Sequence, residues 1–485
     1  MPASAVEYEL VAGIETHVQL DTRTKMFCAC AVRFGSPPNS LTCPVCLGHP
    51  GTLPTLNSRA IELGLRAALV LNATVEPRTK FDRKNYYYPD LPKNYQISQF
   101  DLPLARNGWL EIRTRSGPRK IRIHRAHLEE DAGKLIHEEN GTRSFVDLNR
   151  AGVPLLEIVT EPDLRSAEEA HAYLTSLKAI LRAAGISDCD MEKGELRCDV
   201  NVSIRPKGRE ALGVKTEVKN LNSFRFVQKA IETEFRRHVA EVEAGRAVVQ
   251  ATLLFDPERN ETRVMRVKEG AVDYRYFPEP DLPPLRITPE EIEAVRRALP
   301  EMPEAKRERF LRDYGLGESE ADILSSERAI AEFFEQCARA TGKAKTVANW
   351  VVNEVARVLN EKNLTLEASK LTPSALVEIL GLIDAGVVTV ASAKNLLALT
   401  AETGRAPADL VRERGLGTVT DSGAIERAVD AAIAANPKAV ADFRGGKDAT
   451  IKFLVGQVMK VTKGRVKAPA VEELLRKKLG GPVKS

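Results

Sequence analysis

The stretch GIETHVQL, residues 13–20, carries a carboxylate and an imidazole two positions apart, at Glu15 and His17. Apolar residues such as Ile14 and Val18 occupy the alternate positions, which predicts a strand with one buried face. Glu15 and His17 then share the other face. A carboxylate and an imidazole side by side can ligate a metal ion, exchange a proton or form an ion pair. The pair alone leaves all three chemistries open.

Further acidic residues occur in segments of the same kind. The stretches HRAHLEEDAGK, PLLEIVTEPD and ELRCDVNVSI place Glu129, Glu157 and Asp199 beside apolar residues. A solvated sheet face commonly has this pattern. Acids on several apolar-backed strands would also suit Mg²⁺, which binds few carboxylates and retains water and phosphate ligands. The pattern by itself fits both interpretations.

Cysteine spacing gives the strongest local signal. Four of the seven cysteines lie within 19 positions, as CAC at Cys28 and Cys30 and CPVC at Cys43 and Cys46. Two close pairs of thiolates suit a tetrahedral zinc ion with no open coordination position, so the spacing predicts a structural zinc site. The remaining cysteines lack partner spacing and are expected in the core: Cys189, Cys198 and Cys337.

Two segments mix basic, aromatic and amide side chains: FDRKNYYYPDLPKNYQISQ, residues 81–99, and KTEVKNLNSFRF, residues 215–226. Such mixtures can bind phosphates and stack on bases. A loop packed by its tyrosines fits the first segment equally well. The second segment precedes an expected helix, where anions bind readily. The common glycine motifs for phosphates and dinucleotides are absent from the sequence.

Periodicity predicts a change of architecture along the chain. Alternation predicts strands at 8–20, 119–124, 153–160, 196–204 and 214–219, and helical spacing predicts helices at 166–185 and 222–245. The proline-rich YFPEPDLPPL then predicts a linker, and a capping box at Thr288 and Glu291 starts a purely helical region with a second break near 412–423. We therefore predict a multi-domain chain: an α/β (α+β) domain at 1–288 with a zinc-binding insertion near 28–46, an all-α domain at 289–411 and a small all-α tail at 412–485.

Composition is that of a soluble globular protein, with 43% hydrophobic and 28% charged residues in 485. The sequence has no apolar run long enough to span a bilayer, and MPASAVEYEL lacks the features of a secretory signal. Seven cysteines without an export signal predict a reducing compartment, so we expect a cytoplasmic protein.

Positive charge is concentrated at the C-terminal end. The net charge is +4, yet residues 451–485 contain nine Lys or Arg and two Glu. A basic end segment is typical of binding to a phosphate backbone. The run VEELLRKKL equally suits a solvated helix, because cations favour the C-terminal end of the helix dipole. Charge alone leaves both interpretations open.

Several stretches together resemble one family, the B subunits of the bacterial aspartyl/glutamyl-tRNA amidotransferases. They are GIETHVQL, CPVCLGHPG, FDRKNYYYPDLPKNYQISQ, HLEEDAGK, DLNRAGVPLLEIVTEPD, GELRCDVNVSIRP and KTEVKNLNSFRF, in the order of the family. The helical remainder is similar in length and character. The resemblance therefore spans nearly the whole chain, and long motifs of mixed chemistry are far more specific than any single spacing.

The resemblance implies a cradle-like N-terminal domain, a helical domain and a tail domain that binds tRNA. It implies an ATP-dependent carbon–nitrogen ligase that phosphorylates the side-chain carboxylate of misacylated Glu-tRNA(Gln), Asp-tRNA(Asn) or both, using Mg²⁺, and then transfers ammonia to it. The implied partners are an amidase subunit, which releases ammonia from glutamine, and a small linker subunit, in a heterotrimer. The four cysteines make the chain similar to the zinc-bearing members.

With this resemblance, the acidic pattern becomes a hypothesis for the magnesium and ATP site. The expected catalytic residues and magnesium ligands are Glu15, His17, Glu129, Glu157 and Asp199. The expected phosphate contacts are Lys84, Arg205, Lys215 and Lys219. The alternative is a non-catalytic tRNA-binding scaffold protein of the same complex, in which the acidic faces serve folding only. A zinc hydrolase is disfavoured, because four cysteines leave the metal no open position.

Overall fold

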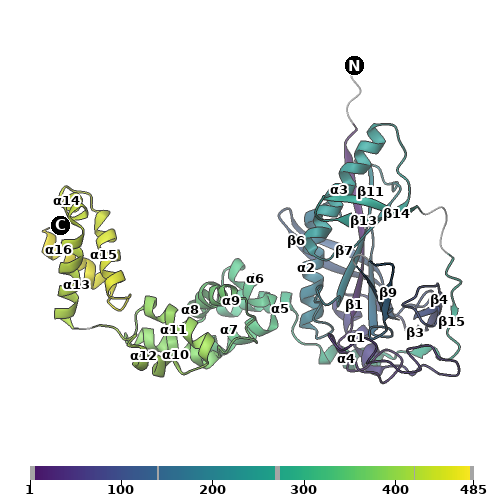
Figure 1. Ribbon diagram of the computed structural model, residues 1–485, viewed down its shortest axis with the longest axis horizontal. Coiled ribbons are helices and arrows are strands. Elements are labelled where there is room, and N and C mark those ends of the chain that lie inside the picture. The colour runs from purple at the N-terminus through teal and green to yellow at the C-terminus, as the bar shows by residue number, and fades with distance from the viewer. Residues whose placement is uncertain (1–5, 139–140, 268–272, 420, 481–485) are drawn as a thin grey trace, which may run out of the picture. The chain divides into compact units, whose positions relative to one another are not determined.

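The computed structural model describes residues 6–138, 141–267, 273–419 and 421–480. The chain divides into two compact units, Met1–Met302 and Pro303–Ser485 (Figure 1). The first unit combines a large sheet with helices, whereas every regular element described in the second unit is a helix. The predicted change from a mixed region to a helical region is therefore confirmed.

The main sheet runs through the whole first unit. Its strands are β1 (Tyr8–Gln19), β2 (Thr74–Val75), β6 (Ala105–Thr114), β7 (Gly117–Glu130), β10 (Pro154–Thr160), β11 (Leu196–Pro206), β12 (Thr216–Lys219), β13 (Ala251–Asp256) and β14 (Glu261–Val267). Over the described residues their order is β14-β13-β12-β11-β1-β10-β7-β6-β2, and only β12 and β13 pair in parallel. The strands predicted from alternation are all present, and β1 lies near the centre of the sheet.

One face of this sheet is apolar and is covered by helices. Ile14 and Val18 of β1 belong to one buried cluster with Leu174 of α2 (Ala167–Ala183) and Val227 of α3 (Phe224–Glu243). Helix α1 (Ser58–Val70) adds residues such as Leu63 to the same cluster. Figure 1 shows α2 and α3 along one side of the sheet. The opposite face is therefore left to the polar residues of alternate parity.

Short strands form smaller sheets outside the main one: β3 (Arg78–Thr79), β4 (Asp82–Asn85), β5 (Tyr95–Ser98), β8 (Lys134–His137), β9 (Ser144–Asp147), β15 (Phe277–Pro278) and β16 (Leu285–Arg286). Figure 1 shows β3, β4 and β15 on the side of the main sheet away from α2 and α3. Strand β15 pairs with β4, and β16 pairs with β3. The proline-rich segment therefore lies inside the first unit, and the prediction that it is a linker between domains is wrong.

Helix termini follow the caps that the sequence indicates. The Ser166 hydroxyl accepts a hydrogen bond from the Glu169 backbone N–H at the start of α2. The predicted capping box at Thr288 and Glu291 is present in α4 (Pro289–Ala298). Helix α4 packs against α1, so the first compact unit extends beyond the proline-rich segment, to Met302.

The second unit contains two buried apolar clusters. One includes Phe310, Trp350 and Val411, and the other includes Val429 and Leu475. The helices are α5 (Pro303–Tyr314), α6 (Glu318–Ser326), α7 (Arg328–Thr341), α8 (Ala344–Asn349), the π-helical η1 (Trp350–Val355), α9 (Ala356–Lys362), α10 (Pro373–Asp384), α11 (Val390–Thr403), α12 (Pro407–Arg414), α13 (Ser422–Ala435), α14 (Pro437–Arg444), α15 (Thr450–Val461) and α16 (Ala468–Leu479).

Candidate active site and metal centre

Strand register places four polar side chains in one row across the main sheet. His17 of β1 lies opposite Glu157 of β10 and Arg197 of β11. Glu157 in turn lies opposite His127 of β7. Because alternate residues of a strand point to the same face, Glu129 of β7 joins this group two positions further along. The row lies on the face opposite the helices.

The row contains a compact carboxylate–imidazole cluster. His17 Nε2 lies 3.6 Å from Glu157 Oε2 and 3.8 Å from Glu129 Oε1. His127 Nε2 lies 3.2 Å from Glu157 Oε2 and 3.7 Å from Glu129 Oε2. One ligand atom from each of His17, Glu129 and Glu157 lies within 4.8 Å of the others, which suits a shared cation. We name this group, with His127, the acid–histidine cluster.

The cluster holds opposite charges together. Burial alone would lower the pKa of His17, but the hydrogen bond and charge of Glu157, with the charge of Glu129, raise it to about 9. Burial would raise the pKa of both carboxyls, yet the two imidazoles keep these values below the ordinary range. Without a metal, the raised pKa of His17 therefore favours an imidazolium that offsets the charge of the two carboxylates. A bound cation would replace a proton on His17, because only the neutral ring nitrogen ligates metals.

A lysine from β4 adds positive charge beside this cluster. Lys84 Nζ lies 5.0 Å from the ring centroid of Tyr274 and 5.8 Å from that of Tyr86. Burial would lower the pKa of Lys84, but the charges of Glu129 and Glu157 raise it. The ammonium is therefore held charged between aromatic rings and carboxylates.

The other predicted residues fall in different surroundings. Asp199 forms an ion pair with Lys219, whose Nζ also lies 3.0 Å from Glu217 Oε1. Glu15 lies opposite Asp199 in the register, and its Oε1 accepts a hydrogen bond of 2.9 Å from Asn201 Nδ2. The structure thus places these acids in a second row, next to the cluster.

A cavity of about 1260 Å³ lies over the polar face. It is lined by His17 and Glu129 of the cluster and by Lys84, Asp199 and Lys219 among the predicted residues. Two predicted phosphate contacts do not belong to its described lining. Arg205 forms an ion pair of 2.7 Å with Glu9, and Lys215 is exposed.

Sequence reasoning missed three residues of this face. His127 completes the acid–histidine cluster, and its Nδ1 is buried without a hydrogen-bond partner. Arg197 donates to Asp131 over 2.8 Å, and both line the cavity. His127 shares its strand parity with Glu129, and Arg197 shares its parity with Asp199, so alternation contained the signal. The pairing between distant strands, which brings these side chains together, could not be predicted from any single segment.

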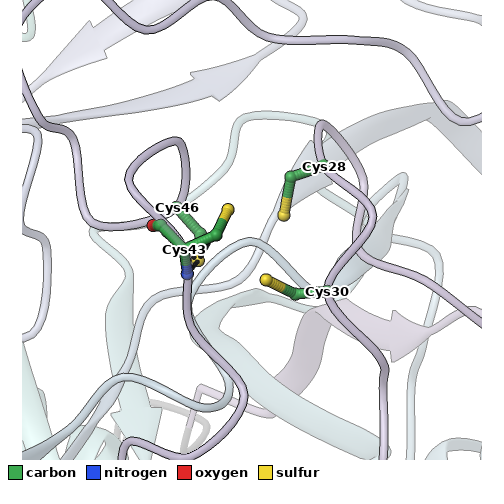
Figure 2. Close-up of side chains that lie close together, drawn as sticks. All are labelled: Cys28, Cys30, Cys43 and Cys46. Carbon is green, nitrogen blue, oxygen red and sulfur yellow. Dashed lines mark hydrogen bonds between the residues drawn. The ribbon is translucent and has the colours of Figure 1, made fainter.

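The four predicted zinc cysteines converge. Figure 2 shows Cys28 and Cys30 on one segment and Cys43 and Cys46 on a turn opposite, with sulfurs directed toward the space between them. Their sulfur atoms lie within 4.8 Å of one another, and the Cys43 backbone N–H donates to Cys46 Sγ over 3.2 Å. A hydrogen bond from Cys28 and the nearby Lys25 charge lower the pKa of Cys46 to about 4, against the effect of burial. This arrangement can hold a thiolate-binding metal.

A buried lysine accompanies these cysteines. Lys25 is 0% exposed, and its Nζ lies 3.5 Å from Cys46 Sγ and 3.3 Å from the Leu148 carbonyl oxygen. Among the described residues it has no carboxylate within ion-pair distance. A buried ammonium needs a negative partner, which here is thiolate sulfur. The other cysteines, Cys189, Cys198 and Cys337, are buried, as predicted.

Comparison with known families fits both groups of side chains. Residues 10–293 match the model of the GatB/GatE catalytic domain, and residues 332–479 match that of the GatB domain. The chain belongs to the GatB family. The acid–histidine cluster and the four cysteines all lie within the part that matches the catalytic domain.

Individual relatives cover the chain almost completely. The B subunit of the aspartyl/glutamyl-tRNA(Asn/Gln) amidotransferase of Carboxydothermus hydrogenoformans is 51% identical over 98% of this chain and 99% of its own length. The proteins of the same name from Myxococcus xanthus and Geotalea daltonii are each 50% identical, over 99% and 98% of this chain and 100% of their own lengths. Among the described residues, each helix is too short or too polar to cross a membrane. The family predicted from the sequence motifs is therefore confirmed.

Proposed function

We propose that the protein acts in the cytoplasm as the B subunit of an aspartyl/glutamyl-tRNA(Asn/Gln) amidotransferase. It binds misacylated Glu-tRNA(Gln), Asp-tRNA(Asn) or both, and uses ATP to convert the side-chain carboxylate into an amide. The observation that supports this most directly is the acid–histidine cluster at the cavity, in a chain that matches the catalytic domain of this family. The proposed partners are an amidase subunit that supplies ammonia from glutamine and a small linker subunit, in a heterotrimer.

The proposed reaction has two steps. A carboxylate is a poor electrophile, because an oxide ion would have to leave. Its oxygen therefore attacks the γ-phosphorus of ATP, which forms an acyl phosphate and releases ADP. Ammonia then attacks the acyl carbon and loses a proton, and phosphate leaves. A cavity that limits access of water favours amide formation, because the acyl phosphate has to react with ammonia before water hydrolyses it.

The cluster has donors that fit a magnesium ion. Two carboxylates and one imidazole within 4.8 Å leave further positions for water and phosphate oxygens. A bound ion would supply positive charge against the phosphates of ATP. His17, Glu129 and Glu157 would hold it. Glu15 and Asp199 remain proposed ligands, because they face each other in the adjacent row.

Lysines of the cavity are the proposed phosphate contacts. Lys84 and Lys219 both line it, and both ammonium groups lie among carboxylates that keep them charged. Each can turn toward an incoming phosphate, which offers more negative charge than its present partners. Arg205 pairs with Glu9, and Lys215 lies outside the described lining of the cavity. We therefore propose only Lys84 and Lys219 as phosphate contacts.

The cysteine cluster is proposed as a structural zinc site. Four sulfurs close together and one buried ammonium match a closed thiolate centre, which leaves no position for a substrate. Metal at this site would contribute folding energy rather than chemistry. The insertion near 28–46 is thus assigned to holding the fold.

The helical tail at 412–485 is proposed to contact tRNA. Exposed lysines of α15 and the turn after it, Lys452, Lys460 and Lys463, have no ion-pair partner among the described residues. Replacing these three with Gln is expected to weaken tRNA binding and to reduce its salt dependence by up to about one unit of slope for each lost phosphate contact. Filter binding over a range of salt concentrations measures this. An unchanged slope would assign these lysines to the solvated helix surface instead.

The decisive experiment separates catalysis from scaffolding. The complex is assembled with its amidase and linker subunits, and ATP hydrolysis is measured with misacylated Glu-tRNA(Gln) and with correctly acylated Gln-tRNA(Gln). Hydrolysis is expected only with the misacylated tRNA and is expected to disappear in Glu129→Gln. The matched control Glu111→Gln, on the exposed side of β6, should behave like the wild type. If Glu129→Gln retains full hydrolysis and amidation, the scaffold alternative holds.

A further inference from the structure

The segment between the two cysteine pairs, residues 31–42, is here called the cysteine loop. Its base is fixed on both sides. Ala31 forms a β-bridge with Thr24, and the Val32 backbone N–H donates to the Arg23 carbonyl over 3.2 Å. At the other end it runs directly into Cys43. The two cysteine pairs therefore flank the loop at both ends.

Two asparagines connect the loop to β9 and to the segment that follows it. Asn39 Nδ2 donates to the Val146 carbonyl over 2.9 Å, and Asn39 Oδ1 accepts from the Leu148 N–H over 2.8 Å. Asn149 Nδ2 donates to the Pro37 carbonyl over 2.7 Å, and Asn149 Oδ1 accepts from the Leu41 N–H over 2.8 Å. These reciprocal bonds fix the position of the loop beside the sheet.

The loop forms a wall of the same cavity that His17 and Glu129 of the acid–histidine cluster line. Its residues Arg33, Phe34 and Ser36 line the cavity together with His17 and Glu129. Phe34 is 69% exposed there. Arg33 is also exposed and has no ion-pair partner among the described residues. A large aromatic ring and an unpaired guanidinium thus stand next to each other on a fixed wall.

This combination matches one ligand chemistry. An exposed ring at a cavity wall can stack on a nucleobase, and an adjacent guanidinium binds phosphate or extends the stack. The carboxylates of the cluster instead suit a cation or the reacting groups, so the wall and the cluster provide for different parts of one ligand. An adenosine nucleotide carries both a base and phosphates. In the proposed function, which this inference assumes, it has two sources: ATP and the terminal adenosine of the tRNA.

We infer that Phe34 and Arg33 form an adenosine-nucleotide subsite on the cysteine loop. The ring of Phe34 stacks on the base, and the Arg33 guanidinium contacts a phosphate. A metal ion held by the four cysteines would support this subsite, because it would close the loop at its base. The insertion that carries the cysteines therefore contributes to substrate binding through its loop, in addition to stabilising the fold.

The test uses the assembled complex and two probes. The Kd is measured for ATP, and separately for misacylated tRNA with and without its terminal adenosine. Phe34→Ala is expected to weaken binding of one probe by roughly 10-fold, whereas Phe34→Tyr keeps it. A loss confined to ATP identifies ATP as the occupant, and a loss that disappears when the terminal adenosine is removed identifies the tRNA. Unchanged affinity for both probes overturns the inference.

A control and a double variant sharpen the result. Phe145→Ala removes another exposed ring, 51% exposed on β9 but outside the described cavity lining, and should leave both affinities unchanged. Cys43→Ser should weaken the same probe as Phe34→Ala, and the double variant should lose little more, because both act on one subsite. If the losses of affinity in the two single variants add up in the double variant, the cysteines and Phe34 act independently, and the cysteines do not support the subsite. If the wild type shows no hydrolysis dependent on misacylated tRNA, the proposed function fails, whereas normal hydrolysis with an unaffected Phe34→Ala overturns this inference alone.

Discussion

The first unit contains two groups of side chains that can each hold a cation, and the protein builds them in opposite ways. The four cysteines come from one stretch of 19 residues and meet through local turns. The acid–histidine cluster takes His17, His127 and Glu157 from three strands that are neighbours only in the folded sheet. The cysteines offer soft sulfur ligands, and four of them would leave a metal no open position. The acid–histidine cluster offers harder oxygen and nitrogen ligands and lies at a large cavity.

This difference predicts that the cysteines stabilise the fold, whereas the acid–histidine cluster takes part in the reaction. A closed thiolate site returns its binding energy to folding, and its ligands have no position left for a substrate. Carboxylates and imidazoles on rigid strands keep their geometry without a metal, so an ion and a phosphate can come and go. Loss of a cluster residue should therefore abolish activity in a folded protein, whereas loss of a cysteine should affect the fold itself.

The largest expected effect concerns the cluster. His17→Ala should reduce amidation of misacylated tRNA by at least about 1,000-fold, because a ligand of the site and the partner of Glu157 are both removed. The protein should still fold, because His127 and Lys84 continue to offset the two carboxylates, and a thermal unfolding scan checks this. His124→Ala is the matched control, on the same sheet but exposed and paired with Glu161. Near-normal amidation by His17→Ala would exclude this cluster from the mechanism.

The second prediction concerns the cysteines. Cys43→Ser should abolish stoichiometric metal binding, measured by elemental analysis. It should also lower the free energy of unfolding by about 4 kcal/mol, measured by urea denaturation, because the metal binds only the folded form. Cys337→Ser, buried in the second unit, should retain the metal. Metal-free but fully stable wild-type protein would contradict the assignment.

The third prediction concerns a buried carboxylate–imidazole pair on α3, Glu234 and His238, which lies outside both metal-binding groups. Glu234 and His238 are both 0% exposed, but Glu234 also accepts hydrogen bonds from Arg237 and Thr216. Against the effect of burial, the hydrogen bonds from His238 and Arg237 lower the pKa of Glu234 to about 2. No third metal ligand joins them in the described part of the chain. We therefore expect a role in stability only.

The lowered pKa of Glu234 predicts that the protein loses stability as the pH falls. Glu234 should contribute about 3 kcal/mol above pH 4.5, and this contribution should be lost as the pH falls toward 2. Glu234→Gln should therefore reduce the change in unfolding free energy across this range, measured by urea denaturation at several pH values, without an effect on the chemistry of amidation. Glu243→Gln, exposed on the same helix, is the control. A pH dependence equal to that of the wild type would contradict the prediction.

The smallest expected effect concerns Lys25. Because its ammonium contacts Cys46 Sγ and has no carboxylate partner among the described residues, Lys25→Met should weaken metal affinity by about 10-fold. Competition with a chromogenic chelator measures this affinity. Lys207→Met, at an exposed pair with Glu7, should not change it. An unchanged affinity in Lys25→Met would show that the ammonium does not support the thiolates.

Local patterns predicted much of this protein. Alternation located β1, β7, β10, β11 and β12, and a capping residue with three-and-four spacing located α2. The cysteine pairs predicted their own convergence. These features depend on residues within one turn, strand or loop, where steric and hydrogen-bonding preferences act directly. Strand β13, whose consecutive residues Ala251, Thr252 and Leu253 are all buried, lacks this alternation and was not predicted.

The sequence by itself determined which faces are polar, which cysteines meet and that a helical region follows the sheet. Only the tertiary structure decided that His17, Glu129 and Glu157 form one cluster with His127, while Glu15 and Asp199 lie in the next row and Arg205 pairs with Glu9. The physical reason is register. Strand pairing joins segments more than a hundred residues apart, and each pairing is fixed by the packing of the whole sheet rather than by either segment alone.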